Sequence, residues 1–98
     1  MKHKTSELEG ALLDAFVRKA VGKGLGWAGD LYQPSTNWAH GGPLLDEHIG
    51  SLEKEDGRLW WAEPGGFADS WAISKGPTML IAACRAIVLA KLGEEVEL

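Results

Sequence analysis

Little in this 98-residue chain points to an oxidising or a membrane environment. The only cysteine is Cys84, and a single thiol forms no disulfide within the chain. No stretch approaches the roughly 20 apolar residues of a membrane span, and residues 1–7 lack the apolar run of a signal peptide. We therefore expect a soluble cytoplasmic protein, with residues 1–98 forming one domain.

Positive charge is also scarce. Ten Lys and Arg stand against fourteen Asp and Glu, which gives a net charge of −4. The nearest basic group is Arg18, Lys19 and Lys23, at the end of an expected helix, where cations interact favourably with the helix dipole. Because a negative chain repels phosphate backbones, the composition argues against nucleic acid as a partner.

Metal ligands and catalytic sets are missing as well. The histidines His3, His40 and His48 have no i,i+3 or i,i+4 spacing, and a Gly-Gly-Pro break separates the last two. Activated thiolates lie at helix N-termini, whereas Cys84 is in mid-helix and is expected to be a small core residue. We predict no metal site, no cofactor and no catalytic residue.

The clearest pattern present is a helix from Thr78 to Leu92. Thr78 can cap its first turn, and Gly93 marks its end. Apolar side chains fill every sector of this helix, so it should be covered on several sides. Two helices and a small sheet leave room for a subunit contact as part of that cover.

Arg85 is the exception within this helix, because its wheel neighbours are apolar. A desolvated cation needs partners, so we expect carbonyls of Trp38–Pro43, or the carboxylate of Asp46 or Glu47, to hold the guanidinium. The alternative is an arginine that extends to water at the helix edge.

Two further helices are predicted. The first should run from Thr5 or Ser6 to Val21, with Asp14 and Arg18 paired on its wet side and Gly10 weakening it. A short helix should begin at Pro43, which suits a first helical turn, and end near His48. The hydrophilic residues 50–57 are interpreted as a solvated loop.

A small antiparallel sheet completes the predicted α+β fold. Residues 58–63 and 69–74 are strand-like and should form a hairpin through Pro64–Gly66. A further strand could come from residues 26–32 or from the tail 94–98, which is otherwise frayed.

Tryptophan is unusually frequent, with five in the chain. Successive strand side chains point to opposite faces, so Trp60 and Trp61 cannot both enter one core. Tryptophan is enriched in binding hot spots, and a small domain hides few indoles. We therefore single out Trp60, Trp61 and Trp71 as candidate interface residues.

Three separated blocks of the sequence resemble one known family. They are Lys4–Leu8, Ser35–Pro43 (Ser-Thr-Asn-Trp-Ala-His-Gly-Gly-Pro), and the final helix from Gly76-Pro77-Thr78 through Leu80–Ala83 and Arg85 to Lys91–Gly93. This pattern is similar to the NinX-like family of small temperate-phage and prophage proteins, whose function is not established. Asn37, His40 and Met79 depart from the residues usual there, which are aspartate, glutamine and proline.

The resemblance implies a phage or prophage accessory protein in the cytoplasm of the bacterial host, and no particular reaction. Its blocks supply the candidate binding residues, which are Trp38, His40, Gly41, Gly42, Pro43 and Arg85. The leading hypothesis is a non-enzymatic module that binds another protein or itself. The alternatives are a small-ligand-binding protein or enzyme with a pocket around Trp38, His40, Asp46 and Arg85, and a nucleic-acid-associated phage factor.

Overall fold

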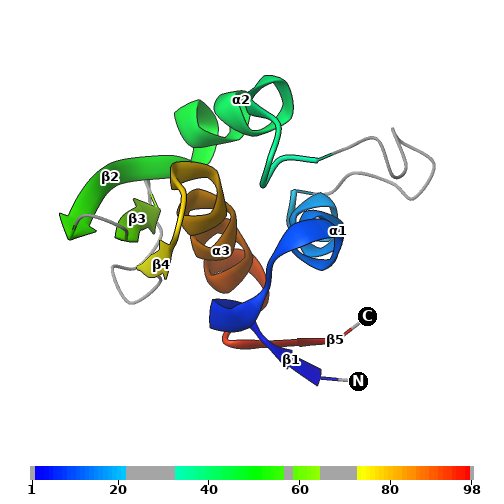
Figure 1. The fold of residues 1–98 in the computed structure, drawn as a ribbon. Helices are drawn as coiled ribbons and strands as arrows, with labels where there is room; N and C mark the ends of the chain where they lie inside the picture. The colour runs from blue at the N-terminus through cyan, green and yellow to red at the C-terminus, as the bar shows by residue number, and fades with distance from the viewer. Residues whose placement is uncertain (1, 22–32, 57–58, 65–72, 98) are drawn as a thin grey trace.

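The computed structural model describes residues 2–21, 33–56, 59–64 and 73–97 (Figure 1). These residues form three α-helices, a short 3₁₀ helix and five strands. In chain order they are β1 (Lys2–Lys4), η1 (Thr5–Glu7), α1 (Gly10–Ala20), α2 (Trp38–His48), β2 (Ile49–Asp56), β3 (Leu59–Pro64), β4 (Ser74–Gly76), α3 (Met79–Leu92) and β5 (Glu95–Glu97). The predicted α+β class is confirmed. In the described part of the chain, no helix is long and apolar enough to cross a membrane.

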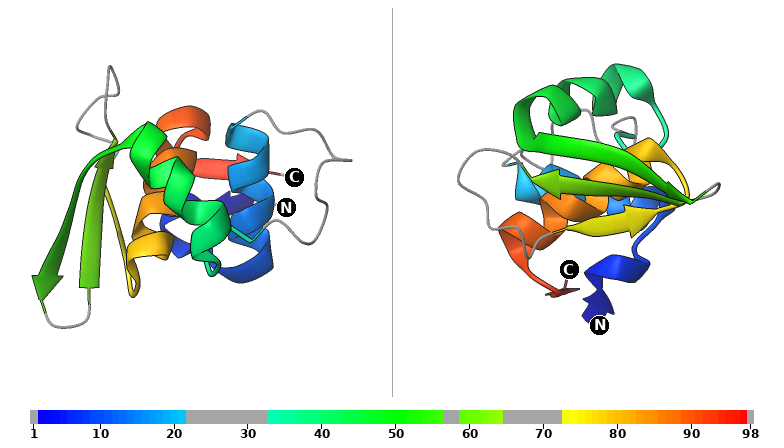
Figure 2. Two further views of the ribbon diagram at one scale, coloured as in Figure 1. Left: turned by 90° about the horizontal axis from the view of Figure 1, so that it is seen from above. Right: turned by 90° about the vertical axis from the view of Figure 1, so that its left-hand side faces the viewer.

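The elements stack in layers around α3. One antiparallel sheet has the strand order β2-β3-β4 and lies against one side of α3, while α1 packs on the other side (Figure 2). α2 runs over the top of both layers in Figure 1 and leads directly into β2. A second sheet pairs β1 with β5 and so brings the two ends of the chain together (Figure 1).

α3 begins and ends where the sequence predicts. Thr78 Oγ1 accepts a hydrogen bond from the Ile81 N–H at 3.1 Å, and Gly93 is the C-cap residue. Leu80, Ala82, Ala83, Cys84, Ala86, Ile87 and Val88 are all buried. Elements of the same chain therefore cover these seven side chains.

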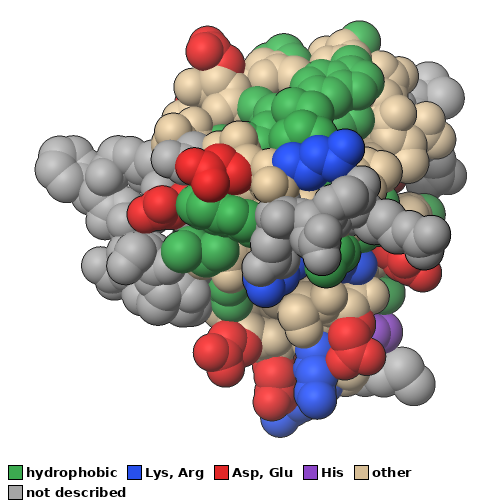
Figure 3. Space-filling view, turned by 60° about the vertical axis from the view of Figure 1, so that its left-hand side comes forward, with side chains coloured by type: hydrophobic (Ala, Val, Ile, Leu, Met, Phe, Trp, Pro, Cys, Tyr) green, Lys and Arg blue, Asp and Glu red, His purple; other side chains and the backbone are tan. Residues whose placement is uncertain are grey.

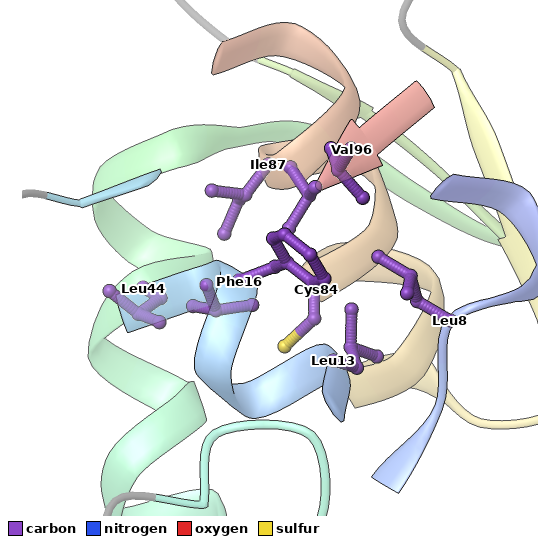
Figure 4. Packing of buried hydrophobic residues seen from close by; sticks show 9 residues of the cluster. Leu8, Leu13, Phe16, Leu44, Cys84, Ile87 and Val96 are labelled. Atoms are coloured by element: carbon purple, nitrogen blue, oxygen red, sulfur yellow. The ribbon is translucent and has the colours of Figure 1, made fainter. Parts of the chain in front are cut away.

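Two apolar clusters flank α3. The larger one lies between α1 and α3 and includes Phe16, Leu13 and Cys84, with Leu44 of α2 and Val96 of β5 (Figure 4). The smaller cluster consists of alanines, with Ala62 of β3 against Ala82, Ala83 and Ala86 of α3. Small side chains on both surfaces let the helix approach the sheet closely.

The start of the first helix differs from the prediction. Thr5 lies in the 3₁₀ turn, where its Oγ1 donates to the Gly93 carbonyl oxygen at 2.6 Å instead of capping α1. α1 begins at Gly10, which has a φ of +61°. This left-handed conformation favours glycine, so Gly10 lets the chain enter the helix and does not weaken its interior. Asp14, predicted to face water, is buried.

The second helix is longer than predicted. The Asn37 side chain accepts the Ala39 N–H at 2.8 Å and caps α2, which therefore starts at Trp38 and not at Pro43. Pro43 consequently lies inside the helix, where its missing N–H leaves the Ala39 carbonyl without its usual intrahelical donor. The cap at Asn37 was the stronger signal for the helix start.

The predicted solvated loop at 50–57 is wrong, because Ile49–Asp56 form β2. Leu52 pairs with Ala62 and faces the alanine cluster, whereas Glu53 pairs with Trp61 on the opposite face. Glu53 and Lys54 are exposed, as is typical of charged residues on an edge strand.

β3 and β4 are antiparallel neighbours, with Trp61 opposite Lys75. The predicted partner strand at 69–74 is thus partly misplaced, because β4 spans Ser74–Gly76. Trp71 and residues 65–72 and 26–32 lie outside the described residues. The tail does form a strand, β5, but it pairs with β1 in a separate sheet.

Candidate functional site: a groove between two tryptophans

The turn before α2 is tied to two helices. His40 Nδ1 accepts the Gln33 N–H at 2.9 Å, which holds the turn against α2. The Ser35 N–H donates to Asp14 Oδ1 of α1 at 2.8 Å. Burial of Asp14 is therefore explained, because its carboxylate satisfies a buried backbone donor. These bonds give His40 a structural role in shaping the turn.

Gly41 fits α2 tightly against its surroundings. A Cβ atom built at this position would overlap the Pro34 carbonyl oxygen and lie 2.7 Å from Leu80 Cδ2. Real side chains essentially never approach so closely, so the position accepts only glycine without a shift of the turn or of α3. At Gly42 the nearest atom to such a Cβ would be Trp38 Cε3, at an ordinary 3.9 Å.

Trp38 differs from its neighbours in the same segment, because 53% of it is exposed. It lies at the first position of α2 and borders a hollow of about 450 Å³. We call this hollow the Trp38–Trp60 groove; its lining residues are Ser35, Thr36, Trp38, Trp60, Pro77, Thr78, Met79, Leu80 and Ile81. The starts of α2, β3 and α3 gather at one end of the molecule to form it (Figure 2).

Trp60 forms the second aromatic side of the groove. It is partly buried and packs against the alanine cluster, on the face of the sheet that meets α3. The Lys54 ammonium lies 5.8 Å from the centre of a Trp60 ring, within the range of a cation–π interaction. Trp61 points to the other face of the sheet, so the structure separates the two adjacent indoles as the strand period predicts.

Arg85 does find carbonyl partners, but they are not those predicted. Its Nε donates to the Leu8 carbonyl oxygen at 2.7 Å, and one terminal nitrogen donates to the Lys75 carbonyl oxygen at 2.9 Å. The guanidinium thus joins Leu8, which directly follows η1, to β4, and does not bond to the Trp38–Pro43 segment. Partial burial lowers the pKa of Arg85, and the negative charge of Glu9 opposes this change.

Arg85 borders a second hollow, of about 670 Å³, between β4 and the β1–β5 side of the molecule. Lys4, Lys75, Glu94 and Glu95 also line it, so charges of both signs are present. We call it the Arg85 cavity. Neither this cavity nor the groove contains both Trp38 and Arg85, so the structure does not join them in one pocket.

The other predicted site residues are scattered. Gly41 is buried, Pro43 is exposed on α2, and Asp46 is exposed further along the same helix. Trp71 lies outside the described residues. Across 2–21, 33–56, 59–64 and 73–97, there is no cluster of three His, Cys, Asp or Glu side chains that could hold a metal ion.

Sequence reasoning missed the role of Ser35. This serine is 2% exposed, and its hydroxyl has no hydrogen-bond partner among the described residues. It lines the Trp38–Trp60 groove beside the start of α3. In the sequence, Ser35 lies in a polar Gln-Pro-Ser-Thr turn, a composition that is typical of an exposed loop and carries no signal of burial.

The comparison with known families supports the resemblance drawn from the sequence blocks. No curated protein matches the chain. A family model described as "Bacteriophage P22, NinX" matches residues 4–91, a range that contains α1, α2, the three-stranded sheet and almost all of α3. Because this match covers most of the chain, the protein belongs to the bacteriophage P22 NinX family.

Proposed function

We propose that this NinX-family protein is a non-enzymatic accessory protein of the phage that binds another protein through the Trp38–Trp60 groove in the bacterial cytoplasm. The observation that carries the proposal is the 53% exposure of Trp38 beside a hollow of about 450 Å³. Exposing an indole leaves a large apolar area in water, and tryptophan contributes strongly to protein interfaces when a partner covers it.

The rest of the segment from Ser35 to Pro43 supports this assignment. Asn37 caps α2, His40 holds the turn, and Gly41 packs against Leu80. Each of these residues has a structural reason within the chain. Trp38 has no structural role of comparable size among the described residues, although its ring lies near Gly42. A binding role accounts for Trp38 where folding does not.

Because most of α3 is buried, its middle is not available as the surface that binds a partner. The apolar sequence of α3 also favours association, but most of its apolar side chains are buried within the chain. The face seen in Figure 3 carries an apolar area among charged side chains, a mixture that is typical of non-obligate interfaces. We therefore expect reversible binding of a separate partner, and no obligate dimer formed through α3.

The test is a pull-down from bacteria in which the phage replicates, with three forms of the protein. The wild type is compared with Trp38→Ala and with Leu59→Ala, which removes another exposed apolar side chain, 41% exposed, at the Arg85 cavity. We expect a protein that the wild type and Leu59→Ala retain and Trp38→Ala loses. Calorimetry with the purified partner should then show at least about a tenfold weaker Kd for Trp38→Ala.

Two results would contradict the proposal. If Trp38→Ala recovers as much of the partner protein as the wild type, the groove is not the binding surface. If only Leu59→Ala loses the partner, the binding surface lies at the Arg85 cavity. Light scattering addresses self-association: a dimer that Trp38→Ala dissociates would identify a second copy of the chain as the partner.

A second candidate function is small-ligand binding in the Arg85 cavity. Its volume of about 670 Å³ lies within the range of ligand pockets, which is about 300–1,000 Å³. Two carbonyls fix the guanidinium at its edge, leaving further N–H donors for an anionic ligand. A thermal-shift screen of small carboxylates and phosphates tests this idea. Arg85→Lys should abolish any shift that depends on the guanidinium.

A further inference from the structure

The guanidinium of Arg85 lies at the Arg85 cavity with part of its hydrogen-bonding capacity unused. Its Nε donates to the Leu8 carbonyl oxygen, and its Nη1 donates to the Lys75 carbonyl oxygen in a bond that is exposed to solvent. A guanidinium has five N–H donors, so both donors on Nη2 stay without a partner among the described residues. Two backbone bonds therefore fix the group and leave donors for a ligand.

Arg85 also lacks a counter-ion in the described part of the chain, where no carboxylate forms an ion pair with it. The negative charge of Glu9 opposes the lowering of its pKa, but the two groups do not form an ion pair. Removing a charge from water is costly unless an opposite charge or hydrogen bonds compensate for it. A half-buried cation with unused donors therefore favours an anionic ligand.

The charges that line the cavity favour a monoanion over a dianion. Three described lining residues are cationic, Lys4, Lys75 and Arg85, and two are anionic, Glu94 and Glu95. Lys4 and Glu95 lie opposite each other in the β1–β5 sheet, so their charges offset each other within the protein. The described lining thus has a single net positive charge, which one carboxylate balances and a phosphate dianion exceeds.

The same cavity collects exposed apolar side chains. Leu59 and Ile73 are each 41% exposed, and with Trp38 they are the large apolar residues exposed in the described part of the chain. Both line the Arg85 cavity, as does the half-buried Leu89 of α3. Apolar burial favours binding in proportion to the area removed from water. A ligand that covers these side chains therefore needs an apolar body as well as its charge.

We propose that the Arg85 cavity binds a small monocarboxylate with an apolar chain. The carboxylate accepts hydrogen bonds from the Nη2 donors of Arg85, and the chain lies against Leu59, Ile73 and Leu89. A volume of about 670 Å³ accommodates such a molecule. This inference rests on the second candidate function, because it names the chemical class of the ligand that the cavity takes.

The test is an NMR titration of the full chain with hexanoate. Hexanoate should shift the backbone amide signals of Lys75 and Gly76 and leave the Trp38 and Trp60 indole signals in place. Two matched probes each remove one half of the ligand: acetate has the charge without the chain, and hexan-1-ol has the chain without the charge. Both should bind at least about tenfold more weakly than hexanoate.

The other outcomes overturn the inference. Equal binding of hexanoate and hexan-1-ol would show that the carboxylate contributes nothing, and equal binding of hexanoate and acetate would show the same for the chain. Tighter binding of hexanedioate or inorganic phosphate would identify a dianion site. Shifts confined to the Trp38 and Trp60 indoles would place the ligand in the groove. No shift with any probe would leave the cavity without this class of ligand.

Arg85→Gln should weaken hexanoate at least about tenfold, because it removes both the charge and the fork of donors. Lys91→Gln is the matched control, because it removes an exposed cation from the last turn of the same helix, outside the cavity. Its affinity for hexanoate should equal that of the wild type. Unchanged binding by Arg85→Gln would contradict the role of the guanidinium.

Ile73→Ala tests the apolar half of the ligand and remains informative if the loss of the Arg85 bonds unfolds the protein. Because Ile73 is exposed, its replacement should change the melting temperature little. It should weaken hexanoate about threefold and leave acetate unaffected, because only the longer chain covers this side chain. If Ile73→Ala binds hexanoate as tightly as the wild type, the chain does not lie where we place it.

These measurements separate failure of this inference from failure of the second candidate function. If phosphate or hexanedioate shifts the cavity signals at lower concentration than hexanoate, the cavity is a ligand site and only the ligand class is wrong. If no probe shifts them and the thermal-shift screen also finds nothing, small-ligand binding in the cavity fails as well. The pull-down tests the groove independently, because Trp38 does not line the Arg85 cavity.

Discussion

The middle and the start of α3 differ in how far the chain covers them. Along its middle, Cys84, Ile87 and Val88 join Phe16 of α1 in a core whose side chains are almost fully covered (Figure 4). At its start, Trp38 is exposed and borders one groove, which Ser35 also lines. The chain therefore covers the first region by itself, whereas Trp38 stays half exposed beside the second.

The largest effect on stability should come from the core. Phe16 is fully buried, so Phe16→Ala should lower the free energy of unfolding by about 3–5 kcal/mol through lost burial and a cavity. Urea unfolding followed by tryptophan fluorescence measures this loss. Phe16→Leu is the control and should keep most of the stability. If Phe16→Ala lowers the free energy of unfolding by less than about 1 kcal/mol, the core is packed no more tightly than the groove at the start of α3.

Gly41 and Gly42 form a matched pair at the boundary between the regions. Gly41→Ala should cost about 1–3 kcal/mol, because its Cβ would collide with Pro34 and Leu80. Gly42→Ala should be neutral or stabilise by up to about 1 kcal/mol, because alanine favours the helix and has room there. Chemical unfolding of both variants checks the difference. Equal effects would mean that the turn does not constrain α2 at Gly41.

The pH dependence of stability reports whether solvent reaches Cys84 in the core. Burial raises the pKa of its thiol to about 12, and the charge of Asp14 acts in the same direction. The unfolded chain loses this proton near pH 8.5–9, while the folded chain retains it, so rising pH favours unfolding. Stability should fall by about 1.4 kcal/mol per pH unit between pH 9 and 12 through this group.

Cys84→Ala isolates that contribution from the lysines and the tyrosine that titrate in the same range. Its unfolding free energy should lack the thiol-dependent part of the slope, so the difference between the two proteins should change with pH above 9. A constant difference from pH 8 to 11 would indicate that the thiol reaches solvent in the folded protein.

Local signals in the sequence were sufficient for the ends of α3, but they left the tail open between an edge strand and a frayed end. Thr78 and Gly93 mark the ends of α3, and the alternating tail forms β5. The ends of α3 depend on residues close together in the chain, whereas β5 also depends on its pairing with β1 at the other end of the chain. The start of α2 was missed although Asn37 is a good cap, because Gly41, Gly42 and Pro43 are poor helix formers. Tight packing of Gly41 explains why the fold tolerates that composition.

The candidate site depended on contacts that no local pattern reveals. Asp14 and Ser35 are 21 positions apart, and only the fold shows that one carboxylate satisfies the other residue's amide and allows its burial. Arg85 likewise bonds to Leu8, 77 positions away. Sequence reasoning predicted that this cation needs carbonyl partners, but physical need alone does not identify which segment supplies them.

The smallest effect on stability should come from the residue with the largest effect on binding. Trp38 is 53% exposed, so Trp38→Ala should change the free energy of unfolding by no more than about 0.5 kcal/mol. Trp60→Ala should cost more in the same urea experiment, because Trp60 packs against the alanine cluster. A loss of 2 kcal/mol or more for Trp38→Ala would make this indole a structural residue and would remove the contrast between core and groove. A small loss, with the partner no longer bound, would show that the start of α3 is built for binding at little cost to the fold.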